Sequence, residues 1–220
     1  ASRRARIALA VPLLVLLALA VLLSRPTPPA ESAGFVLAAC QDGVPAGLQP
    51  GQTDAASVAA WVGRRMDLEW ATTASLEDGT YIGWAPAPGI EVWRRREALT
   101  LAVRDGRLAY VELDAAPAGA SLGAVVDVAG PPESTWAGVE SCTEAGCAYA
   151  VGLSYPARGL AVIAEAFGPL QSDGDRRAVV AGPEMPVTRA RCFAAGDAGA
   201  PGEETVPWEG FGATYWRPAQ

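Results

Sequence analysis

The sequence predicts an α+β fold in which a single N-terminal transmembrane helix precedes two tandem repeats, each a short helix packed on an antiparallel sheet. Three observations lead to this prediction. Residues 7–23 form an unbroken apolar run. Two short apolar segments further along begin at capping residues and end at or near glycine, as amphipathic helices do. Each of these segments is followed by stretches in which apolar and polar residues alternate, which is typical of half-buried strands.

The apolar run has the length and the flanks of a membrane-spanning helix. At about 1.5 Å rise per residue, residues 7–23 extend over roughly 26 Å, close to the bilayer core of about 30 Å. Arg3, Arg4 and Arg6 precede the run, and basic flanks tend to stay in the cytoplasm. We therefore expect a single-pass protein of the cytoplasmic membrane, with a cytoplasmic N-terminus, an extracytoplasmic C-terminal domain and the lipid bilayer as a partner through residues 7–23.

Two other interpretations of the N-terminal region stay open. Arginines followed by an apolar core also begin a cleaved secretory signal. Residues 37–40 resemble a lipoprotein processing box that ends at Cys40, although residues 25–33, with three prolines, separate it from the apolar run.

The composition excludes several kinds of chemistry. Half of the residues are apolar and 19% are charged, with 24 glycines and 18 prolines, which indicates a globular chain with many turns. Histidine, lysine and asparagine are absent, so all 17 basic residues are arginine. The usual general base, the commonest nitrogen ligand for metals and the Schiff-base amine are therefore missing. We expect no enzyme activity, no cofactor and no metal.

Charge argues against nucleic acid as a partner. The net charge is −7, whereas a phosphate-binding surface needs clustered positive charge. The one basic run is Arg94, Arg95 and Arg96. It is interpreted as a solvated loop or as the guard of an edge strand, with contact to anionic lipid or to an acidic partner as the alternative.

Four cysteines, Cys40, Cys142, Cys147 and Cys192, follow the apolar run. On the extracytoplasmic side disulfides are expected, and four thiols allow three pairings. A turn-like insert separates Cys142 from Cys147, which allows a bridge across a hairpin, and Cys40 would then pair with Cys192. A zinc site of four thiolates is the alternative, but the two close C-x-x-C pairs typical of such sites are missing.

The pattern in the first half of the chain predicts a helix followed by strands. Thr53 or Asp54 can cap a helix over 55–62, and Gly63 can end it. Strands are expected at 69–75 and 81–84, and a further pair, 98–103 and 108–113, flanks the dipeptide Asp105-Gly106. Asp-Gly between alternating apolar residues is a strong hairpin signal.

The second half repeats the pattern after a linker at 115–120. Ser121 is a plausible cap for a helix that ends at Gly130-Pro131-Pro132. Strands are expected at 135–141, 148–155, 159–165 and 187–193. The predicted organisation is a signal-anchor (1–25), a linker with a first strand (26–46), a first repeat (47–114), a second repeat (115–195) and an aromatic tail (196–220).

The aromatic residues of the tail are candidates for a contact surface. Its aromatic side chains either cover the protein's own sheet or dock onto a partner, where tryptophan and tyrosine often dominate binding energy. These residues are Trp208, Phe211, Tyr215 and Trp216.

The helix entries and exits resemble a known family. The turn at 50–53 and the run from Ser121 into Gly130-Pro131-Pro132 are similar to the SmpA/OmlA-type repeat of β-barrel assembly lipoproteins and other exported bacterial proteins. The tandem arrangement resembles the β-lactamase inhibitor protein. Arg64-Arg65 stands where the first repeat would have its glycine-proline step, so the likeness is weaker there. The resemblance implies a non-catalytic module for protein binding or scaffolding.

Three functional hypotheses follow. The first is a membrane-anchored extracytoplasmic protein-binding or scaffolding module, an accessory subunit that joins other membrane or envelope proteins in a complex. The second is a free-standing surface inhibitor or ligand-binding module. The third is a carboxylate-dependent hydrolase, for which Glu140 and Glu144 are the candidate acids.

Overall fold

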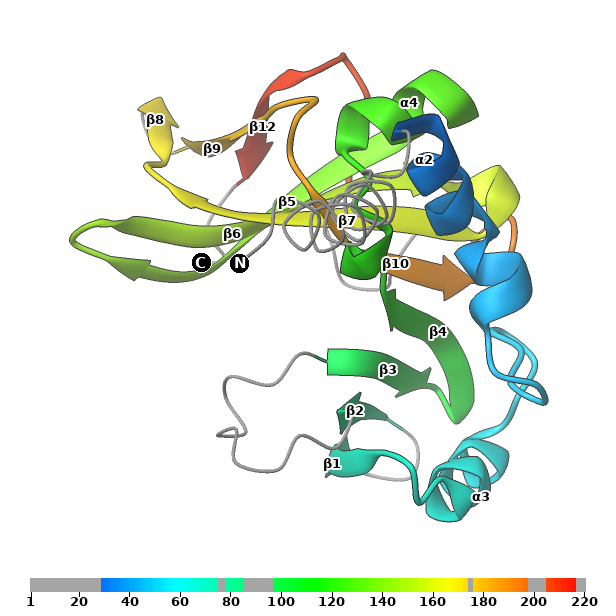
Figure 1. The fold of residues 1–220 in the computed structure, drawn as a ribbon. Coiled ribbons are helices and arrows are strands. Elements are labelled where there is room, and N and C mark those ends of the chain that lie inside the picture. The colour runs from blue at the N-terminus through cyan, green and yellow to red at the C-terminus, as the bar shows by residue number, and fades with distance from the viewer. Residues whose placement is uncertain (1–28, 75–77, 85–96, 174–175, 198–204, 217–220) are drawn as a thin grey trace, which may run out of the picture.

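The structure is a computed structural model that describes residues 29–74, 78–84, 97–173, 176–197 and 205–216. Its main element is a nine-stranded antiparallel sheet in the order β1-β2-β3-β4-β10-β7-β6-β5-β11. A second sheet has the order β12-β9-β8, and Figure 1 shows it beside the β5–β6 end of the large sheet. The strands of the first half are β1 (Glu69–Ala74), β2 (Gly79–Trp84), β3 (Glu97–Arg104) and β4 (Arg107–Asp114). Those that follow are β5 (Ser134–Thr143), β6 (Gly146–Tyr155), β7 (Leu160–Gly168), β8 (Gln171–Asp173), β9 (Arg176–Ala181), β10 (Val187–Phe193), β11 (Val206–Pro207) and β12 (Gly212–Trp216).

The predicted architecture of two tandem helix-on-sheet repeats is wrong, because the two halves share one sheet. Strand β10 pairs with β7 on one side and with β4 on the other, with Cys192 opposite Val111 and Arg191 opposite Glu112. These pairs join residues more than 75 positions apart in the chain. Alternation of side chains predicts that a segment is a strand but not which distant strand lies beside it, so the joined sheet was missed.

The predicted transmembrane helix and membrane location are also corrected. Within the described ranges, no helix has both the length and the apolar character needed to cross a bilayer. The predicted span, residues 7–23, lies outside the described residues, and so do Arg94, Arg95 and Arg96.

Local signals predicted two of the helices well. Helix α3 (Ala55–Arg64) begins at Asp54, whose side chain accepts a bond from the Ser57 backbone N–H at 2.8 Å. That bond lowers the pKa of the Asp54 carboxyl. Helix α4 (Leu122–Ala129) begins at Ser121, whose side chain accepts from Ala124 N–H at 3.3 Å. Of the two candidate caps for the first of these helices, Asp54 is the one used, and the predicted cap Ser121 is confirmed.

One helix was not expected. Residues 26–46 were assigned to a linker and a first strand, but α2 (Pro29–Ala38) is helical and runs into a π-helical turn, η1 (Ala39–Gly43). Helix α2 lies beside α4 (Figure 1). Two short 3₁₀ turns, η3 (Ala116–Ala118) and η4 (Pro156–Arg158), complete the described helical elements.

The helices cover one face of the large sheet. Helices α2 and α4 pack on β5, β6, β7 and β10 in one apolar cluster, while α3 packs on β2, β3 and β4 in a second. Ala190 and Cys192, two positions apart on β10, belong to the first and second cluster respectively, so both clusters lie on the same face. Glu112 and Arg191, at the alternate positions, lie on the opposite face, which we call the polar face.

Candidate functional site

The structure contains the disulfide between Cys40 and Cys192, with the two Cα atoms 5.2 Å apart. It ties η1 to β10. Cys40 packs against both apolar clusters, and Cys192 is buried in the second. The bond therefore fastens the end of the first helical segment to the strand that joins the two halves of the sheet.

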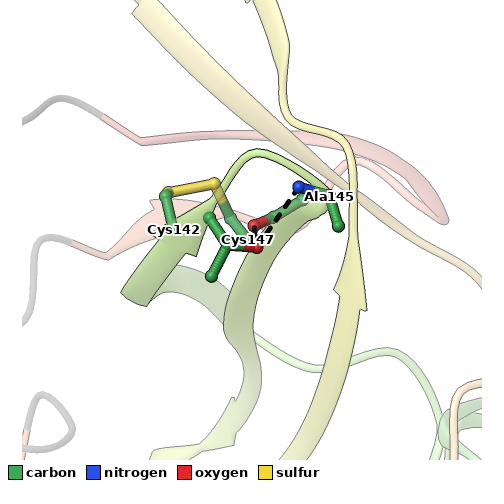
Figure 2. The surroundings of a disulfide bond; sticks show 5 residues. Cys142, Ala145 and Cys147 are labelled. Carbon is green, nitrogen blue, oxygen red and sulfur yellow. Dashed lines mark hydrogen bonds between the residues drawn. A yellow bond between two sulfur atoms is a disulfide. The ribbon is translucent and has the colours of Figure 1, made fainter.

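The second disulfide, Cys142–Cys147, closes the turn of the β5–β6 hairpin, as Figure 2 shows. Two hydrogen bonds also stabilise the turn. The Thr143 hydroxyl donates to the Gly146 carbonyl at 3.2 Å and accepts from the Ala145 N–H at 3.3 Å. The hairpin extends to one side of the molecule (Figure 1). Its far end is therefore held by a covalent bond as well as by the strand ladder.

The tail is part of the fold. Strand β11 pairs with β5, and β12 pairs with β9. The rings of Trp208 and Phe211 meet edge to face, with centroids 5.1 Å apart, and pack against the first apolar cluster. This placement favours the interpretation that they cover the protein's own sheet. Tyr215 and Trp216 lie on β12, but their side chains are outside the described part of the structure.

The polar face carries an ionic group that the sequence did not single out. Glu112 is only 4% exposed and accepts two bonds, from Arg189 Nη1 and Arg191 Nε, each at 2.7 Å. Because Glu112 is on β4 and both arginines are on β10, the group bridges the seam between the two halves. We call Glu112, Glu140, Glu165, Arg189 and Arg191 the seam cluster.

Arg189 connects the buried and the exposed parts of the seam cluster. Its Nη2 donates to the Glu165 carboxylate and lies 3.7 Å from Glu140 Oε1. The Glu165 side chain is 39% exposed and that of Glu140 is 58% exposed. The cluster thus runs from the buried Glu112 on β4 and Arg191 on β10 to partly exposed carboxylates on β7 and β5.

Aromatic rings enclose the buried end of the cluster. The Arg191 guanidinium lies 4.5 Å from the Tyr110 ring centroid and 5.6 Å from that of Trp136. Trp136 is buried with Ala150 and Ile163 in a small apolar group on this face. A guanidinium over aromatic faces is stabilised by the ring quadrupoles, the more so when it is shielded from water.

The position of Trp136 depends on Gly152, its partner on β6. A Cβ at Gly152 would lie 2.1 Å from the indole Cε2 and Nε1. We expect Gly152→Ala to lower the free energy of unfolding by about 1–3 kcal/mol, because the ring must shift. Chemical denaturation monitored by far-UV circular dichroism measures this loss.

Gly138→Ala is the matched control for that substitution. Gly138 is on β5, and a Cβ there would approach Trp136 no closer than 3.9 Å, an ordinary contact. Equal losses for the two variants would show that the indole does not depend on the missing side chain at Gly152.

Of the two acids proposed from the sequence, Glu140 lies near Arg189, while Glu144 is an exposed residue of the hairpin turn. Among the described residues, no three His, Cys, Asp or Glu side chains are grouped so that they could hold a metal ion. The Glu112 carboxylate accepts bonds from Arg189 and Arg191, and the Glu165 carboxylate accepts one from Arg189.

The fold therefore defines a class, a disulfide-bonded antiparallel sheet with helices packed on one face. Comparison with protein-family models, curated proteins and solved structures finds no match for this chain. The resemblance to the SmpA/OmlA-type repeat stays a prediction.

Proposed function

We propose that the protein is a non-catalytic protein-binding module. It contacts its partner through the end of the polar face that lies next to the turn of the β5–β6 hairpin. The observation that supports this best is Phe167, a large aromatic side chain that is 59% exposed on β7. Glu165 precedes it by two positions and so faces the same side of the sheet. We call Phe167, Glu140 and Glu165 the contact patch.

The contact patch stands on a rigid support. Strand β7 pairs with β6 along nine consecutive residue pairs, from Tyr155–Leu160 to Cys147–Gly168. A Cβ on Gly146 would lie 3.1 Å from Phe167 Cε1, so the ring lies against the disulfide-closed turn. A rigid surface loses less conformational freedom on binding, which favours affinity.

The chemistry of the contact patch indicates the chemistry of the partner. Exposed aromatic side chains often supply the central anchor of a protein interface, with charged groups at its rim. Glu140 on β5 and Glu165 on β7 add partly exposed carboxylates, both next to Arg189. We expect the partner to present an apolar pocket for Phe167 with arginine or lysine next to it.

Site-specific photo-crosslinking tests this proposal. A photoreactive phenylalanine analogue at position 167, in the native host, should give one discrete adduct whose partner is identified by mass spectrometry. With that partner purified, Phe167→Ala should weaken binding at least about tenfold, as expected for an anchor residue.

Position 66 provides the control. Met66 is 90% exposed in the turn between α3 and β1. The photoreactive analogue at position 66 should therefore give no discrete adduct, and Met66→Ala should leave the affinity for the partner nearly unchanged. If both positions give the same adducts, or if Phe167→Ala binds as tightly as the wild type, the contact patch is not the binding surface.

A further inference from the structure

A pocket lies beside the Cys40–Cys192 disulfide, away from the residues of the contact patch. Its volume is about 360 Å³. It is formed where η1 and the loop after it meet η4 and the end of β10. Leu48, Cys192 and Phe193 are buried and supply apolar wall.

The pocket is held open by local bonds in its walls. In the loop, the Gln49 N–H donates to Thr53 Oγ1 at 2.7 Å, and the Gly51 N–H donates to the Leu108 carbonyl at 2.7 Å. On the other side Gly159 has φ +60°, and a Cβ there would lie 2.4 Å from the Phe193 carbonyl oxygen. Only glycine lets η4 approach the end of β10 so closely.

Arg158 is the one charged residue among the described residues that line the pocket. The chain has a net charge of −7, yet none of the described residues that line the pocket carries a carboxylate, and Arg158 supplies a positive charge. Three amide side chains, Gln41, Gln49 and Gln52, also line it. Amides offer both donors and acceptors, and a guanidinium offers donors in a fork that matches a carboxylate.

Arg158 is positioned by the end of α4. Its Nη2 donates to the Ala129 carbonyl at 3.3 Å. Nearby, the Tyr155 hydroxyl donates to the Gly130 carbonyl at 3.2 Å, and burial raises the pKa of Tyr155 to about 12. Tyr155 therefore stays a neutral donor at physiological pH and helps to hold η4, which carries Arg158.

We propose that this pocket binds a small carboxylate-bearing ligand, with Arg158 pairing with the carboxylate and the glutamine amides bonding its other polar groups. The volume is at the lower end of the range of roughly 300–1,000 Å³ for small-molecule sites. The π-helical turn η1 in its wall is a conformation that occurs often at functional sites. Free organic acids and the C-terminal carboxylate of a peptide share this chemistry.

Calorimetric titration of the full, oxidised chain tests the proposal with three probes: benzoate, the tripeptide Ala-Ala-Phe and its C-terminal amide. Binding of benzoate alone identifies a free acid as the source. Tighter binding of the tripeptide identifies a peptide terminus. The amide should bind at least about tenfold more weakly than the acid, because it lacks the charge that Arg158 recognises.

Variants at Arg158 provide a second test of the proposal. Arg158→Gln should weaken carboxylate binding at least about tenfold, and Arg158→Lys should restore it only in part, since lysine keeps the charge but loses the fork. Arg64→Gln, which changes an exposed arginine on α3 outside the pocket, should bind the carboxylate probes as tightly as the wild type does. All three variants should have the melting temperature of the wild type. Lack of binding by both acids, equal binding of acid and amide, or unchanged binding by Arg158→Gln would overturn the proposal.

Discussion

Replacing both Cys40 and Cys192 by alanine is expected to lower the free energy of unfolding by about 5 kcal/mol. The two cysteines are 152 positions apart, and a cross-link that closes so long a loop removes much of the conformational freedom of the unfolded chain. Since a domain of this size has a total stability of about 5–15 kcal/mol, the variant should lose at least about a third of its stability.

The native contacts of this disulfide should add to the loss. Cys40 touches both apolar clusters, and Cys192 is buried on the strand that joins the two halves. Without the bond, η1 is free to leave β10, so the pocket beside it should lose its wall. Urea denaturation without reductant, followed by circular dichroism, measures the change in stability.

The matched control is the double alanine variant at Cys142 and Cys147. That bond spans five positions and should contribute only about 2 kcal/mol by the same entropy model. The prediction fails if the two double variants lose equal stability, because loop length would then not be the main term.

Glu112→Gln is expected to lower the free energy of unfolding by about 3 kcal/mol or more. Glutamine has nearly the shape of glutamate, so no cavity forms. The substitution removes the negative charge that faces Arg189 and Arg191 in a site where Glu112 is almost fully buried. Removing one partner of a buried ion pair is costly because the remaining charge is poorly solvated. Salt should change the loss little, since screening is weak for buried pairs.

Glu140→Gln controls for the chemical change at the same arginine. Glu140 lies 3.7 Å from Arg189 and is mostly exposed, so its loss should cost less than about 1 kcal/mol. Chemical denaturation at low and high salt compares the two variants. Equal losses, or a Glu112→Gln effect that high salt abolishes, would show that the buried ion pairs of Glu112 do not stabilise the seam between the two halves.

Local features of the fold were predictable because their causes are local. Asp54 and Ser121 cap α3 and α4, as their side chains and positions indicated. The hairpin at Asp105-Gly106 was predicted from its turn residues, and both glycine and aspartate there have positive φ. Strand β10 occupies residues 187–193, as expected.

The candidate site was harder to predict because its members are far apart in the chain. Glu140 was proposed as a candidate from the sequence, but Glu112, Glu165, Arg189 and Arg191 were not. Alternation along β4 and β10 does place Glu112 and Arg191 on the polar sides of their strands, but only the pairing of those strands brings them together. Phe167 gave no signal, because an aromatic residue on a strand is ordinarily buried, and only the fold shows that its side chain is 59% exposed.

The amino-acid sequence by itself determined helices α3 and α4 with their caps, the tight hairpin and an inventory of side chains without histidine or lysine. These depend on neighbouring residues or on composition, so no knowledge of the fold is needed. Only the tertiary structure decided that β4 and β10 join two halves into one sheet, that Arg189 lies among three carboxylates and that Cys40 reaches Cys192. Pairing between distant strands is selected by the packing of whole faces, and that selection leaves no local pattern in the chain.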